Sequence, residues 1–385
     1  MSHPLTGLRV LDFTRHLPGP YATDVLRRLG AQVIKVEPPD GDPTRWLPPF
    51  HHDFGALFNL VNAGKKSVAI DLKSDEGQDF VHRLVKACDI VVESYRPGIA
   101  ERLRIDAETL RAFNPGLIYC SISGFGAENP RSGHDANFVA LAGLLDLQRD
   151  ARGKPILPAT QIGDMGGALF GVVAILAALI ERDRTGEGKI IDISMSDAIR
   201  AMMPTAEALY RGTNHTPESF FLTGALPCYS VYRTADDKHM LVAALEPHFW
   251  KTFCEAIGHP ELIELQYDEK ARFRVFSTIE RTFAEHPRDH WERVFAGIDA
   301  CVEPVLSIED AHARFGDPLK RHPLETNFPS APESIDDVGD SFDLAASLAG
   351  FDETEIRKLR RIPAFKGEGK LKQAISRAVM MFKKT

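Results

Sequence analysis

A chain of 385 residues is long enough for two or three domains, and its 44% hydrophobic and 26% charged residues are typical of a globular protein. The 46 Lys and Arg residues against 54 Asp and Glu residues give a net charge of −8. This balance argues against bulk electrostatic binding to nucleic acid or to an anionic membrane. An anionic ligand must therefore be held by a local basic patch.

Cysteine usage and apolar runs bear on the compartment. The five Cys residues are scattered, without a Cys-x-x-Cys pair or a His cluster, which is typical of a reducing cytoplasm and predicts neither disulfides nor a metal site. The N-terminus shows no signal-peptide pattern. The longest apolar run, residues 165–180, has 16 residues, fewer than the ~20 of a transmembrane helix. We expect a cytoplasmic protein without membrane association, in which this run forms a buried helix.

The first 125 residues alternate between short β-branched runs and segments with helical spacing, such as 22–29 and 76–88. This alternation predicts βαβ units, a parallel sheet and an α/β fold. Several of the runs are almost continuously apolar, as expected for strands covered on both faces. The predicted strands are residues 8–13, 33–37, 67–72, 89–93 and 117–123.

A Gly-rich helix follows at about 163–182, and then a strand at 189–194 and a helix at about 195–211. Gly167 and Gly171 are expected to let this first helix approach its neighbours closely. After about residue 215 the pattern changes to that of a smaller α+β domain, with strands at 228–233 and 240–245 and helical segments to about 310. A Pro-containing acidic stretch at 323–340 is interpreted as a linker, and 353–361 as a helix. The predicted domains are 1–215, 216–325 and 326–385, the last returning to the first.

A basic set in the first domain is the first candidate for chemistry. Several of its members follow the carboxyl ends of predicted strands, where open α/β sheets bind ligands. They could hold phosphates through charge-assisted hydrogen bonds, or they could form an ordinary solvated surface. The set consists of Arg45, Lys65, Lys66, Lys73, Arg96, Arg102 and Arg104.

Two polar segments each allow a structural and a functional interpretation. Asp135 precedes a helix that it could cap, with His134 beside it at the same polar end. Asp164 directly precedes the long apolar run and could be the N-cap of that helix. It could equally be a carboxylate at the edge of a dry pocket, where desolvation increases its basicity. The two segments taken singly favour capping.

Taken in order, these segments resemble the class III CoA-transferase (CaiB/BaiF) family, which includes the α-methylacyl-CoA racemases. The resemblance covers roughly residues 5–255 and is looser afterwards. It rests on LTGLRVLDFTRHLPGPYATDVLRRLGAQVIKVEPPDGDPTR, NAGKKSVAIDLKSDEG, DIVVESYRPG, NPGLIYCSISGFG, SGHDANF, IGDMGGALFGVVAILAALIERDRTGEGKIIDISMSDA and YSVYRTADDKHMLVAALEPHFW. It implies an interlocked homodimer in which each chain has a large Rossmann-like domain and a smaller domain, with the active site formed between subunits.

The resemblance also implies an enzyme acting on acyl-CoA, with no metal and no cofactor other than the CoA of its substrate. In racemases of the family, Asp164 and His134 would be two bases that exchange the α-proton of a 2-methylacyl-CoA, and Glu246 of the other subunit would support the histidine. In transferases, Asp164 would be a nucleophile that passes through an acyl anhydride and an aspartyl-CoA thioester. A CoA-binding protein without turnover is the third alternative.

His134 and the Glu246 segment favour the racemase, whereas Ile162-Gly163-Asp164-Met165 is closer to the transferase form, and Phe138 replaces the usual tyrosine. We favour racemisation, with transfer as the alternative. Residues expected to line the pocket for the acyl group, such as Phe13, His16, Phe125 and Tyr229, suggest an apolar or aromatic acyl chain. For CoA, the resemblance assigns Asp71, Leu72 and Lys73 to the adenosine moiety and Arg96 and Arg104 to phosphates, with Arg45 as a substitute for an arginine that this sequence lacks after Glu37.

Overall fold

The computed structural model describes residues 3–51, 53–150, 152–214, 221–318, 322–328 and 334–366. Their contacts group the chain into two compact units. The first contains described residues within 1–144, 158–204 and 322–366, and the second contains those within 145–157 and 205–318. The domain boundaries expected from the sequence, near residues 215 and 325, stay a prediction, and residues 367–385 of the third segment lie outside the described part.

The first unit is built on a six-stranded sheet in the order β5-β2-β1-β6-β7-β8. Every neighbouring pair in it is parallel, which confirms the predicted α/β class and parallel sheet. All six strands predicted for this unit are present. They are β1 (Arg9–Asp12), β2 (Gln32–Glu37), β5 (Lys66–Ala69), β6 (Ile90–Glu93), β7 (Ile118–Ser123) and β8 (Ile190–Ser194).

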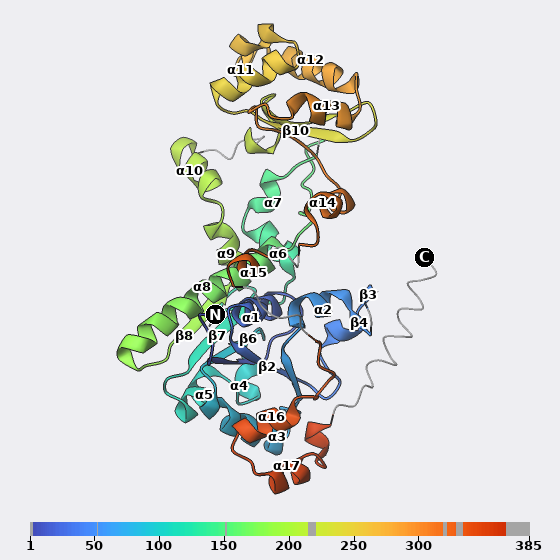
Figure 1. Cartoon of the computed structure of the whole chain (residues 1–385). Coiled ribbons are helices and arrows are strands. Elements are labelled where there is room, and N and C mark those ends of the chain that lie inside the picture. The colour runs from blue at the N-terminus through green and yellow to red at the C-terminus, as the bar shows by residue number, and fades with distance from the viewer. Residues whose placement is uncertain are drawn as a thin grey trace. The chain divides into compact units, whose positions relative to one another are not determined.

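Helices cover both faces of this sheet, which explains why its strands are almost continuously apolar. Figure 1 shows α3 (Asp75–Leu84), α5 (Ala107–Phe113) and α16 (Phe342–Leu348) on one side and α1 (Pro18–Arg28) and α8 (Ile162–Thr185) on the other. Phe80 of α3 stacks on Phe342 and Phe351 with ring centroids 5.5 Å apart. The C-terminal segment therefore completes the core of the first unit.

Helix α8 is longer than the apolar run in the sequence suggested. It has 24 residues and, among the described helices, it alone is long and apolar enough to cross a membrane by length and composition; half of its most apolar window is buried in the protein. A Cβ on Gly167 would lie 2.6 Å from Met195 and one on Gly171 would lie 3.2 Å from Ile122. The glycines thus allow the close approach that the sequence predicted. The cytoplasmic location stays a prediction.

The second unit carries a three-stranded antiparallel sheet in the order β11-β10-β9. Its strands are β9 (Tyr229–Arg233), β10 (His239–Ala243) and β11 (Val302–Pro304), of which the sequence predicted the first two. One face packs on helices α11 (Pro247–Ala256), α12 (Arg272–Ala284) and α13 (Arg288–Phe295) around the buried Trp250 and Phe253. The predicted C-terminal helix is also present, as α17 (Glu353–Leu359).

Candidate active site

The strand order of the first unit creates a topological switch point between β1 and β6. From β1 the chain proceeds outward to β2 and β5, and it then returns to β6 and proceeds the other way to β7 and β8. The loops after β1 and β6 therefore diverge at the carboxyl edge, where open α/β sheets bind ligands. Phe13 N, directly after β1, donates to Val92 O of β6 (2.9 Å), and the two loops are joined by Arg15 N, which donates to Ser94 Oγ (3.2 Å).

A pocket of about 280 Å³ opens at this switch point. It brings together residues that lie more than 140 positions apart in the chain, including both predicted catalytic residues, His134 and Asp164. Three arginines also line it. Its polar lining residues include Arg15, His16, Ser94, Tyr95, Arg96, Asn129, Arg131, His134, Asp135 and Asp164.

Asp164 is the third residue of α8 and is partly buried. The N–H groups at the start of this helix are satisfied by another side chain, because Asp135 Oδ1 accepts from Gly163 N (2.7 Å) and Asp164 N (3.0 Å). The expectation that Asp164 caps α8 and Asp135 caps its own helix is therefore wrong: Asp135, the first residue of α6 (Asp135–Leu141), caps α8 instead. The Asp164 carboxylate forms no hydrogen bond or ion pair with any described residue and remains available for chemistry.

The environment of Asp164 makes it a stronger base. Burial, together with the nearby negative charge of Asp135, raises the pKa of the Asp164 carboxyl to about 7. Desolvation disfavours the charged carboxylate, and a like charge disfavours it further. A proton-transfer group works best when its pKa lies near the operating pH, so this carboxyl is suited to accept and release a proton at neutral pH.

His134 is the N-cap residue of α6 and is exposed in the single chain. Its backbone N–H donates to Asn137 Oδ1 (2.9 Å), which fixes the entry into the helix. The first N–H groups of α8 are not free to stabilise an oxyanion, since those of Gly163 and Asp164 donate to Asp135 and Met165 N donates to Gln161 O (3.0 Å). An enolate or anhydride oxygen would need other donors.

Phe138 lines the same pocket as His134 and Asp164. A Cβ on Gly124 or on Gly133 would lie within 2.8 Å of the Phe138 ring, so only glycine at these two positions allows the segment between β7 and α6 to approach the ring so closely. Phe125 packs edge-on against Phe138, with ring centroids 5.1 Å apart. The buried phenyl ring therefore packs against both ends of the segment that leads to His134 and also lies beside Gly163, which precedes Asp164, and a tyrosine hydroxyl is not needed for that packing.

A second pocket, of about 830 Å³, adjoins the first and shares Arg15, His16, Ser94, Tyr95 and Arg96 with it. Lys73 and Arg102 also line it. The structure thus brings Lys73 and Arg96 together, as expected for phosphate ligands, with Asp71 and the buried Leu72 directly before Lys73. Arg104 is exposed but does not line this pocket; Arg102, which belongs to the predicted basic set, does.

The surroundings of Arg45 argue against the predicted role of this residue as a CoA ligand. Its guanidinium is almost completely buried and binds Glu37 in a bidentate pair, with Nε–Oε2 at 2.8 Å and Nη2–Oε1 at 2.7 Å. Its remaining terminal nitrogen donates to Asp336 O (2.9 Å), and its plane lies 4.1 Å from the Phe58 ring centroid. All three guanidinium nitrogens are therefore used inside the protein, in anchoring the returning C-terminal segment.

A buried ionic cluster below the switch point was not predicted. Asp12, at the end of β1, accepts hydrogen bonds from Thr14 N (2.8 Å) and Thr23 Oγ1 (2.6 Å) and pairs with Lys65 (3.1 Å). Lys35 donates to Thr14 O (2.9 Å) and pairs with Asp42 (3.1 Å). The cluster fixes the turn that leads to Arg15 and His16, the latter in the left-handed region at φ 67°. Lys65 is thus structural rather than a surface phosphate ligand.

The pKa values in this cluster follow from burial and pairing. Burial raises the pKa of Asp12, but the Lys65 and Lys35 ammonium groups and two threonine hydroxyls outweigh it and lower the value to about 2. Burial lowers the pKa of Lys65 to about 8, although Asp12 opposes this shift. Glu93 at the end of β6 behaves differently, since burial raises its pKa to about 7 despite hydrogen bonds from Ser121 and Tyr95 N.

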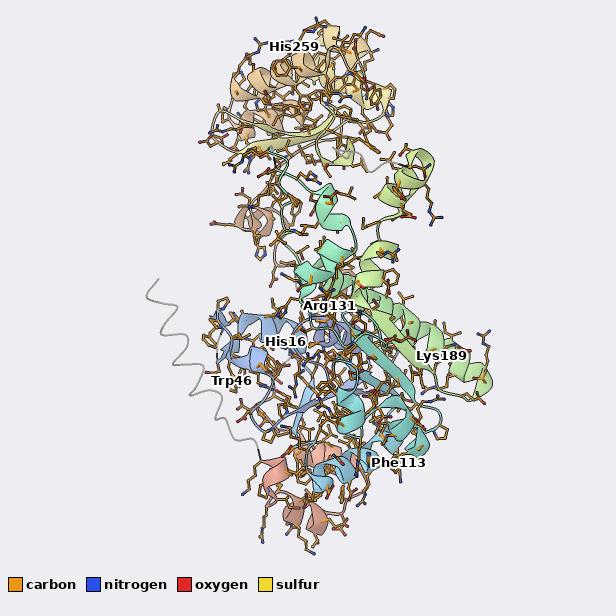
Figure 2. All side chains as sticks on the ribbon, turned by 180° about the vertical axis from the view of Figure 1, so that it is seen from behind. His16, Trp46, Phe113, Arg131, Lys189 and His259 are labelled. Carbon is orange, nitrogen blue, oxygen red and sulfur yellow. The ribbon has the colours of Figure 1, made fainter. Side chains whose placement is uncertain are left out.

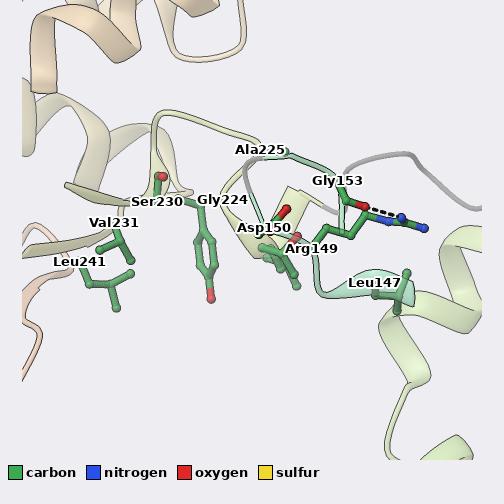
Figure 3. Close-up of a pocket in the computed structure, with 12 residues that line it drawn as sticks. Leu147, Arg149, Asp150, Gly153, Gly224, Ala225, Ser230, Val231 and Leu241 are labelled. Atoms are coloured by element: carbon green, nitrogen blue, oxygen red, sulfur yellow. Dashed lines mark hydrogen bonds between the residues drawn. The ribbon is translucent and has the colours of Figure 1, made fainter. Parts of the chain in front are cut away.

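Glu246 lies in the second unit, where it is the exposed N-cap residue of α11. The same unit contains a pocket of about 610 Å³ beside the uncovered face of its sheet (Figure 3). Gly224 and Ala225 line it together with Tyr229 and Arg149. Arg149 Nη1 donates to Gly153 O (2.8 Å) across this pocket. Glu246 does not line it.

Comparison with known proteins agrees with the geometry. The sequence profile of CoA-transferase family III matches residues 5–324. The chain belongs to this family. Succinyl-CoA:mesaconate CoA-transferase from Haloarcula hispanica is 36% identical over 297 residues, covering 73% of this chain and 74% of that protein. Alpha-methylacyl-CoA racemase from Homo sapiens is 32% identical over 321 residues, covering 80% and 78%.

Structures support the same assignment to CoA-transferase family III. A CaiB/BaiF family protein from Brucella suis superposes with a TM-score of 0.77 at 27% identity, covering 90% of this chain and all of that one. The family relationship predicted from the motifs is thus confirmed, and it extends beyond the residues on which the resemblance was noticed. Because the relatives include both transferases and racemases at nearly equal identity, the reaction has to be argued from the site.

Proposed function

We propose that this member of CoA-transferase family III catalyses α-proton transfer on a 2-methylacyl-CoA. The observation that carries the proposal is the presence of two proton-transfer groups, Asp164 and His134, in one pocket of the first unit. The Asp164 carboxylate accepts no hydrogen bond from the described residues, and its pKa is raised to about 7 by burial and by Asp135. Inversion needs one base on each face of the α-carbon.

In the proposed reaction, one group takes the α-proton and leaves a thioester enolate. The other group gives a proton to the opposite face of that carbon, so the configuration is inverted and no atom is gained or lost. In the reverse direction the two groups exchange roles. A carboxyl with a pKa near 7 can take part in both directions at neutral pH, because its two protonation states are then comparably populated.

Transfer of CoA between carboxylic acids is the second candidate. It is supported by the same unpartnered Asp164 carboxylate, which could attack the thioester carbonyl, and by relatives named for succinyl-CoA:glutarate and acetyl-CoA:oxalate transfer. The attack would form an anhydride and release CoA thiolate, which would then attack the aspartyl carbonyl and release the first acid. The carboxylate of the second acid would attack the resulting aspartyl-CoA thioester, forming a second anhydride and releasing CoA thiolate again. The thiolate would then attack the acyl carbonyl of the second acid, giving the new acyl-CoA and the free Asp164 carboxylate. Covalent catalysis of this kind divides one difficult step into easier ones.

CoA would be bound in the larger pocket, with Lys73, Arg96 and Arg102 as its phosphate ligands. We infer a homodimer in which Glu246 of the partner subunit supports His134. An exposed apolar stripe on α8 would be available for a second copy; within it Val173 and Ile180 are each 62% exposed, next to the exposed Leu169 and Phe170. Light scattering of the purified protein tests the dimer, which a monomer at micromolar concentration would contradict.

Deuterium exchange separates the two reactions. The enzyme is incubated with (2S)- and with (2R)-2-methylbutyryl-CoA in heavy water, with and without free succinate, and the products are analysed by mass spectrometry. Racemisation predicts α-deuterium uptake that needs no free acid. Transfer predicts succinyl-CoA formation that depends on succinate.

Two variants assign the roles. His134→Ala should abolish racemisation, measured as conversion of one 2-methylbutyryl-CoA enantiomer into the other, but largely spare CoA transfer, whereas Asp164→Asn should abolish both. Uptake of no deuterium by the enzyme over a panel of branched acyl-CoAs would reject racemisation. Binding of CoA without either reaction would favour the third alternative, a non-catalytic CoA-binding protein.

A further inference from the structure

Arg131 carries a charge that the protein does not neutralise. Across the described ranges, its guanidinium has no carboxylate within ion-pair distance, and its backbone N–H alone forms a hydrogen bond, to Asn129 Oδ1 (3.2 Å). The guanidinium carbon lies 5.5 Å from the Phe125 ring centroid. Phe125 in turn packs on the buried Phe138. The arginine is therefore oriented by an aromatic wall and keeps its hydrogen-bond donors available.

The position of Arg131 separates it from the proposed CoA ligands. Arg15 and Arg96 line both pockets, and Lys73 and Arg102 line only the larger one. Arg131 lines only the smaller pocket, together with Asp164 and His134. Figure 2 shows Arg131 and His16 at the same end of the first unit. The phosphates of CoA can thus be bound without Arg131, which is left for the acyl side of the substrate.

The charges of the smaller pocket favour an anionic acyl group. Three arginines face two carboxylates there, and one of these carboxylates, Asp135, has an oxygen engaged by the N–H groups of α8. A guanidinium recognises a carboxylate through two parallel hydrogen bonds, a geometry that an apolar chain cannot use. The volume of about 280 Å³ is just below the ~300–1,000 Å³ of typical ligand sites, which favours a short acyl chain.

We propose that Arg131 binds a carboxylate at the far end of the acyl group, so that the substrate is the monothioester of a short, branched dicarboxylic acid. This inference rests on the proposed function, because it names the acyl class for the same site. It differs from the expectation of an apolar or aromatic acyl chain that was based on the sequence. Phe13, on which that expectation partly depended, is almost completely buried and does not line the pocket.

Two thioesters that differ only at the chain end test the proposal. In 2-methylsuccinyl-CoA, with the thioester beside the branch, a carboxylate stands where 2-methylbutyryl-CoA has a methyl group. Affinity is measured by calorimetry and α-deuterium uptake by mass spectrometry. We expect the wild type to bind the succinyl compound at least about tenfold more tightly, since a hydrogen bond to a charged group contributes roughly 10- to 100-fold.

Variants of Arg131 assign that preference. Arg131→Met should weaken binding of 2-methylsuccinyl-CoA by roughly 10- to 100-fold and change that of 2-methylbutyryl-CoA by less than about twofold. Arg131→Lys should retain part of the preference, because it keeps the charge but loses the bidentate geometry. Arg357→Met, which removes an exposed arginine of α17 far along the chain, is the matched control.

The outcomes separate the inference from the proposed reaction. Equal losses for both thioesters in Arg131→Met, or a wild-type preference for the butyryl compound, would overturn the role of Arg131. A preference that is lost in Arg131→Met, but without deuterium uptake or CoA transfer, would support the carboxylate site and reject the proposed reactions. Should Arg131→Met fail to fold by circular dichroism, the Arg131→Lys and Arg131→Gln variants decide the same comparison.

Discussion

Two groups of charged side chains in the first unit differ in burial and in pairing. Asp12, Lys35 and Lys65 are buried, and each is bound to partners inside the protein. Asp164 and Arg131, in the pocket above the strand ends, have side chains without a charged partner among the described residues. Buried charges persist only when they are paired, so the first group stabilises the fold. The second group is left for a ligand.

The largest expected effect on stability comes from a comparison of the adjacent residues Lys65 and Lys66. The Lys65 side chain is 1% exposed and pairs with Asp12, whereas that of Lys66 is 39% exposed and lies 3.7 Å from Asp336. Lys65→Met should leave Asp12 unpaired and lower the free energy of unfolding by about 3–5 kcal/mol. Lys66→Met should lower it by less than about 1 kcal/mol. Urea denaturation measures both, and similar values for the two variants would contradict the distinction.

The pocket carboxylate should affect stability in the opposite sense. The pKa of Asp164 is raised from 3.8 to about 7, so its protonated form favours the folded state. This contribution is fully present below about pH 4 and is lost as the pH rises through 7. Asp164→Asn should therefore gain stability over the wild type above pH 7, by about 1–2 kcal/mol after allowance for partial exposure.

Thermal unfolding of wild type and Asp164→Asn at pH 5 and pH 8 measures this effect. Glu93, whose pKa burial also raises to about 7, is present in both proteins and cancels in the difference. A difference in stability that does not change between the two pH values would show that the carboxyl of Asp164 titrates normally. The same experiment would then remove the basis for its role as a base at neutral pH.

The smallest expected effect separates two arginines that the sequence treated alike. Arg96→Met should weaken CoA binding about tenfold, or about 1.4 kcal/mol, through the loss of one charge-assisted contact. Arg45→Met should lower stability, because it leaves Glu37 buried without its partner, but it should leave the affinity of the folded protein for CoA within about twofold. Calorimetric titration with CoA measures both, and a CoA-binding defect in folded Arg45→Met would restore Arg45 to the site.

Local sequence patterns predicted most of the secondary structure of the parallel sheet. The six strands of the parallel sheet and the glycines that bring α8 close to its neighbours were predicted, because β-branched runs and residue size act over a few positions. The short strands β3 (Phe50–His51), β4 (Phe54–Gly55) and β11 were missed. Two or three residues are too few to show a period.

Charge partners could not be predicted in the same way. From the sequence, Arg45 and Lys65 were interpreted as surface ligands and Asp135 as the cap of its own helix. A sequence shows only which residues are neighbours along the chain, and not which side chains meet in space. Their actual partners are Glu37 with Asp336, Asp12, and the start of α8. Each pairing depends on how helices and strands pack, which no local rule determines.

By itself, then, the sequence determined the α/β class, the family and the two candidate bases, since these depend on periodicity and on short motifs. Only the tertiary structure decided which charges are neutralised. In the folded protein, Lys65 and Arg45 are buried in ion pairs with carboxylates. Asp135 caps α8, and the Asp164 carboxylate has no hydrogen-bond partner among the described residues and a raised pKa. The physical reason is that desolvation and ion pairing depend on distances through space, and residues 8 to 291 positions apart meet in these contacts.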